Sequence, residues 1–97
     1  MVGNNQLAIP DEATRDTQAL ELLRVWLAKG KQLVTLRTGV WEDPAAWGLM
    51  LADLARHVAN SYHQSSGLDA VASLNRIRQG FEIELASPTD HPTGHSI

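Results

Sequence analysis

Residues 20–38 show an alternation of apolar and other positions that predicts an antiparallel β-hairpin. Two runs rich in β-branched and aromatic residues are separated by Lys29 and Gly30, and glycine can supply the positive φ that a tight turn requires. A two-residue loop would place Val25 opposite Val34 on one side of the hairpin. The same register places Leu23 opposite Leu36 on that side, and Trp26 opposite Leu33 on the other. Both sides of the predicted hairpin therefore carry apolar groups.

A helix over residues 19–27 is the alternative for the first strand. Leu20, Leu23 and Leu27 also fit helical spacing, and Gly30 would close such a helix. We favour the hairpin because the second run, up to Thr38, continues the strand-like composition.

Asp43 and Pro44 mark the start of a long amphipathic helix, since aspartate is a good N-cap and proline suits the first helical position. Ser65, Ser66 and Gly67 are expected to end it. Large apolar residues along this stretch share one stripe, which we predict to be core: Trp47, Met50, Leu51, Leu54, Val58 and Tyr62. Beside them runs a flank of small residues that would allow close packing: Gly48, Ala52, Ala55 and Ala59.

A second helix is predicted from about Asp69 until Pro88 stops it. Its apolar face would consist of Ala70, Leu74, Ile77, Phe81 and Leu85. The alternation over residues 81–85 leaves open a third strand after a helix capped by Gly80, but we favour a continuous helix.

The predicted fold class is α+β: an antiparallel β-hairpin followed by two α-helices packed on the sheet, in the order ββαα. The chain of 97 residues suits a single domain, 1–97. The residues before Ala19 are polar, and those after Ala86 are small and include prolines. This composition predicts flexible arms over 1–18 and 87–97. For the first arm, one helical turn near Asp11 is the alternative. The ordered core is then about 19–86.

Composition excludes several classes of function. The chain has no cysteine, which excludes disulfides, thiolate chemistry and the usual structural zinc sites. A net charge of −3 argues against general attraction to nucleic acid or anionic lipid. Neither a long apolar run nor a signal peptide is evident. We expect a cytoplasmic protein that binds neither membrane nor nucleic acid, and we expect no metal or other cofactor.

The run from Leu23 to Tyr62, LRVWLAKGKQLVTLRTGVWEDPAAWGLMLADLARHVANSY, resembles an uncharacterised bacterial family, domain-of-unknown-function family 5076. The string WEDPAAWG, from Trp41 to Gly48, is its most distinctive part, and the similarity extends to the SPTD segment at 87–90. This resemblance implies a bacterial cytoplasmic protein. It brings no activity, ligand or catalytic residue to any position of this chain.

Candidate catalytic and metal sites are weak. Asp53, His57 and Ser61 lie four residues apart on one helix edge, but no nucleophile elbow accompanies them, so we favour a structural role. His57 and His63 would lie on separate helix faces, while His91 and His95 belong to the predicted C-terminal arm. We therefore predict neither catalytic nor metal-binding residues.

Two classes of function remain. The one we favour is a small homo-oligomeric interaction or accessory domain without catalytic activity, because two helices on one side of the hairpin would leave Leu22, Trp26 and Leu33 uncovered. A homodimer joined partly through those residues would cover them. The alternative is a small-molecule-binding protein or small enzyme, with a pocket formed by Arg37, Trp41, Trp47 and His57.

Overall fold

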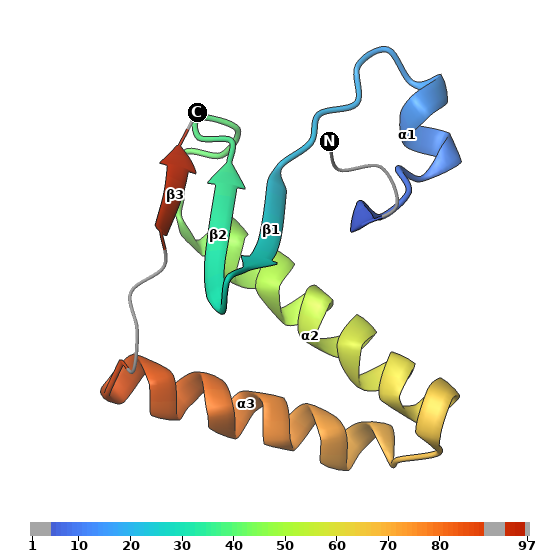
Figure 1. Cartoon of the computed structure of the whole chain (residues 1–97), viewed down its shortest axis with the longest axis vertical. Coiled ribbons are helices and arrows are strands. Elements are labelled where there is room, and N and C mark those ends of the chain that lie inside the picture. Colours follow the sequence, from blue (N-terminus) through green and yellow to red (C-terminus); the bar gives the residue numbers. More distant parts are fainter. Residues whose placement is uncertain (1–4, 89–92, 97) are drawn as a thin grey trace. The chain divides into compact units, whose positions relative to one another are not determined.

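The computed structural model describes residues 5–88 and 93–96. They form a three-stranded sheet and three helices (Figure 1). The chain divides into two compact units, one comprising residues 1–38 and 94–97 and the other residues 39–93. The α+β class and the order of hairpin then helices agree with the sequence prediction. That the helices pack on the sheet stays a prediction.

The hairpin consists of β1 (Leu23–Ala28) and β2 (Lys31–Leu36). Val25 pairs with Val34 and Trp26 with Leu33, so the predicted register is confirmed. Lys29 and Gly30 form the turn, with φ of 54° and 73°. Positive φ at both central residues is the type I′ pattern, whose twist matches that of the flanking strands.

The strand β3 (Thr93–Ser96) pairs with β2, so the sheet order is β1-β2-β3. The strand lies within the stretch 87–97 that the sequence assigned to a C-terminal arm, and residues 89–92 and 97 of that stretch lie outside the described residues. Amino-acid composition did not predict this strand. The hydrogen bonds between strands join main-chain groups, and small polar residues carry these groups as well.

The N-terminal segment contains one short helix, α1 (Asp11–Arg15), which follows Pro10. This is the helical turn that the sequence indicated near Asp11, inside the stretch 1–18 otherwise expected to be a flexible arm. Residues 1–4 of that stretch lie outside the described residues.

The long helix α2 (Ala45–Ser66) begins and ends at the predicted signals. The Ala45 N–H donates to Asp43 Oδ1 at 3.0 Å, and Pro44 already has helical angles. At the other end, Gly67 has φ of 73° and its N–H donates to the His63 carbonyl at 2.9 Å. Glycine adopts this left-handed conformation without a steric penalty, and the helix therefore stops there.

The helix α3 (Ala70–Ala86) is continuous through Gly80, as the sequence favoured. Its N-cap is Asp69, whose Oδ2 accepts from the Ala72 N–H at 2.9 Å. At its C-terminus the Ser87 N–H donates to the Ile83 carbonyl at 3.0 Å, and Pro88 follows. Residues 81–86 are thus helix and not a third strand.

The two long helices contact each other and diverge away from the Gly67 elbow (Figure 1). Among residues 5–88, Ala59 is the buried hydrophobic residue, and Ala55 is half-buried. On α3, Leu74 and Ile77 are half-buried. Two residues of the small-residue flank, Ala55 and Ala59, therefore lie on the packed side of α2, whereas Gly48 and Ala52 are exposed. Trp47 and Met50 of the larger apolar stripe are half-buried. That the stripe is core stays a prediction, like the packing of the helices on the sheet.

Candidate functional site

Several apolar side chains on one side of α2 are exposed. Four of its side chains, spaced at three or four residues, are between 42% and 49% exposed: Leu51, Leu54, Val58 and Tyr62. Residues at this spacing share one side of a helix. We call these four residues the α2 stripe. Exposed apolar side chains that share one side of a helix are a candidate contact surface.

Two tryptophans extend the α2 stripe at its N-terminal end. Trp47 is half-buried and lies one turn before Leu51. Trp41, from the segment that leads into the helix, meets Trp47 edge to face, with ring centroids 5.4 Å apart. This geometry brings the positive ring edge of one indole to the negative face of the other. The pair forms a broad aromatic end to the stripe.

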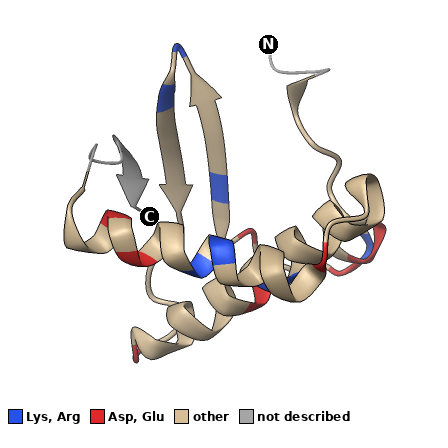
Figure 2. Cartoon of the chain, turned by 90° about the horizontal axis from the view of Figure 1, so that it is seen from below, with Lys and Arg blue, Asp and Glu red and all other residues tan. Residues whose placement is uncertain are grey.

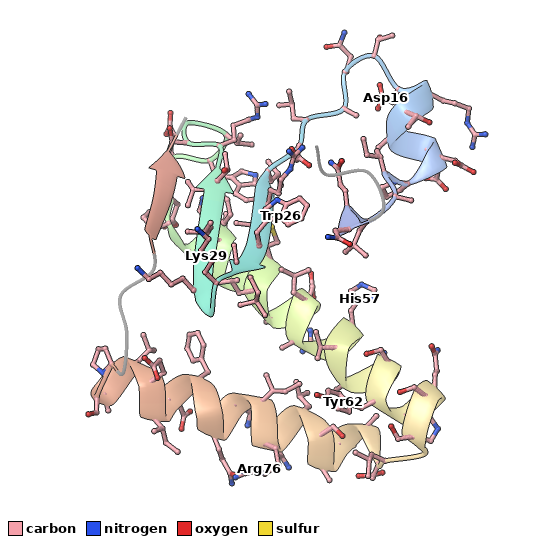
Figure 3. All side chains as sticks on the ribbon, in the orientation of Figure 1. Asp16, Trp26, Lys29, His57, Tyr62 and Arg76 are labelled. Atoms are coloured by element: carbon pink, nitrogen blue, oxygen red, sulfur yellow. The ribbon has the colours of Figure 1, made fainter. Side chains whose placement is uncertain are left out.

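A groove lies at the other end, on the elbow between α2 and α3. Its volume is about 410 Å³, and Tyr62 of the α2 stripe forms part of its wall. Figure 3 shows Tyr62 on the side of α2 that is turned toward α3. The remaining lining residues come from the elbow and the first turns of α3: Leu68, Asp69, Ala72, Ser73, Arg76 and Ile77.

Two residues of the predicted ligand pocket, Trp47 and His57, lie apart on α2. His57 follows Trp47 by ten positions on one helix, which separates them by about 15 Å along the axis. His57 also projects from the side of α2 opposite α3 (Figure 3). The Arg37 Nε donates to the Glu21 carbonyl at 3.0 Å, within the unit that contains the hairpin. Of the four, the structure brings Trp41 and Trp47 together.

The residues of the predicted hairpin interface are less exposed than the α2 stripe. Leu22 and Trp26 are half-buried, and Leu33 is 39% exposed. Trp26, labelled in Figure 3, lines an open pocket of about 670 Å³ that the N-terminal segment borders through Leu7 and Ile9. The N-terminal segment thus lies beside part of the surface that the sequence assigned to a partner.

The side chains of the candidate triad have other partners. Asp53 binds Arg56, at 3.2 Å, and the Ser61 hydroxyl donates to the Val58 carbonyl at 2.7 Å. These contacts tie both residues to their own helix surface. The described residues contain no group of three or more histidine, aspartate or glutamate side chains placed to hold a metal ion.

The two histidines within residues 5–88, His57 and His63, do not lie together. The His63 Nδ1 lies 2.9 Å from the Leu68 carbonyl at the elbow, whereas His57 lies on the outer side of α2. His91 lies outside the described residues, and the side chain of His95 is likewise not described.

Charged side chains are interleaved along the helices. Figure 2 shows basic residues at the hairpin tip, where Lys29 and Lys31 lie, and both signs of charge along α3. Neither long helix within 5–88, nor any other helix there, has the length and apolar content to cross a membrane.

Residues 6–89 match the family described as a domain of unknown function, DUF5076. The chain belongs to the DUF5076 family. This DUF5076 member is also similar to a solved structure described as "a putative pyruvate dehydrogenase from the photosynthetic bacterium Rhodopseudomonas palustrus CGA009". The two chains are 37% identical over 98% of this chain and 97% of the other, with a TM-score of 0.76. No curated protein matches the DUF5076 chain significantly.

Sequence reasoning found the members of the α2 stripe but assigned them to the interior. Beside these residues runs the parallel flank of small residues, which ends in the buried Ala59. Two adjacent apolar faces on one helix can serve two partners, and the small-residue face is the better fit for a closely packed helix of the same chain.

Proposed function

We propose that this chain is a homo-oligomeric interaction or accessory domain of the bacterial cytoplasm, without catalytic activity of its own, and that it acts as a homodimer. The observation that carries the proposal is the extent of apolar exposure. Among residues 5–88, seventeen large hydrophobic side chains are exposed, and no large side chain is fully buried. A second copy is the simplest source of cover, because two-fold dimers are the commonest soluble assemblies.

Stability supports the same proposal. Burying apolar area contributes roughly 25 cal/mol per Å², and chains of this length gain little from their own core. Each α2 stripe residue has between 42% and 49% of its surface exposed, and this is the most that association could remove from water. Self-association therefore adds the apolar burial that the isolated chain lacks.

Two surfaces are candidates for the contact between copies. One is the hairpin surface of Leu22, Trp26 and Leu33; the other is the α2 stripe. Leu33 is 39% exposed and the α2 stripe residues are between 42% and 49% exposed, so exposure does not choose between the two surfaces. The hairpin surface has its own test below.

Catalysis is not part of the proposal. The description of the similar structure names a dehydrogenase, but that description belongs to the other protein. In this chain Asp53 and Ser61 are engaged with Arg56 and the Val58 carbonyl. Such local contacts serve the helix surface and do not prepare a nucleophile.

Thermal unfolding at several protein concentrations tests the proposal. An obligate dimer unfolds at a midpoint that rises with chain concentration, because dissociation accompanies unfolding. We expect such a rise between about 1 and 100 μM, a range that brackets ordinary dimer affinities. A midpoint that stays constant, together with a monomeric mass throughout, would exclude self-association. Trp26→Lys and Leu33→Lys then test the hairpin surface. If neither substitution weakens dimerisation, the two copies are joined through another surface.

A further inference from the structure

We draw no further inference here: the strongest candidate, the groove of about 410 Å³ at the elbow between α2 and α3, carries nothing, because its charged residues Asp69 and Arg76 already bind the Ala72 N–H and Gln79 on their own helix and nothing in the structure shows what covers its apolar walls.

Discussion

The indole rings of Trp41 and Trp47 meet edge to face, with centroids 5.4 Å apart and planes inclined by 81°. This contact fixes the segment before α2 against the first turns of the helix. Trp41→Ala should lower the free energy of unfolding by about 0.5–1.5 kcal/mol beyond the loss of buried area, the usual contribution of an aromatic pair. Urea denaturation at one fixed protein concentration measures it. Trp41→Phe retains an aromatic edge and should lose less; equal losses would show that the ring geometry contributes nothing.

The cap of α2 gives a second prediction. Asp43 Oδ1 accepts from the Ala45 N–H at 3.0 Å, and replacing such a cap with alanine typically costs about 0.5–2 kcal/mol. Asp43→Ala should lower the denaturation midpoint accordingly, while Asp43→Ser, which can also accept from the first-turn amides, should retain most of the stability. An unchanged midpoint in Asp43→Ala would mean that this hydrogen bond does not support the helix.

Alanine substitutions at Gly30 and Gly80 test the effect of backbone conformation apart from that of steric crowding. An added Cβ would meet nothing within 4 Å at either Gly30 or Gly80, but Gly30 has φ of +73°. Gly30→Ala should therefore destabilise the hairpin by about 1–2 kcal/mol through the left-handed conformation alone. Gly80→Ala, within α3, should stabilise by roughly 0.5–1 kcal/mol because alanine loses less entropy in a helix. Shifts of the same sign in both variants would contradict this account.

The elements that sequence predicted correctly are those whose signals are local. Gly30 sets the hairpin turn, Asp43 and Asp69 begin the long helices, and Gly67 separates them. Each acts within a few residues through its own backbone angles or side-chain hydrogen bond. The strand β3 has no such signal, because its partner β2 is far away along the chain.

The candidate site could be predicted only in part. Helical periodicity correctly placed Leu51, Leu54 and Val58 on one side of α2, but it does not tell whether the covering surface belongs to the same chain. Among residues 5–88, Ala59 is the buried residue because small side chains allow α3 to approach α2 closely. The contact between Trp41 and Trp47 joins a loop residue to a helix residue, so no periodicity in the sequence predicts it.

His57 provides a test of the catalytic alternative. Its side chain is exposed on the side of α2 away from α3, where substitutions usually change stability by no more than about 0.5 kcal/mol. We expect His57→Gln to unfold like the wild type and neither protein to turn over ester substrates in a general screen. Turnover by the wild type that disappears in His57→Gln would instead assign this residue to an active site.

Self-association is the central claim, and the molar mass in solution tests it most directly. Size-exclusion chromatography with light scattering, run on the wild-type chain at micromolar concentrations, should give twice the chain mass of 10.6 kDa. Exposed apolar side chains on α2 are the reason for this expectation. A mass of 10.6 kDa across the whole concentration range would contradict the account.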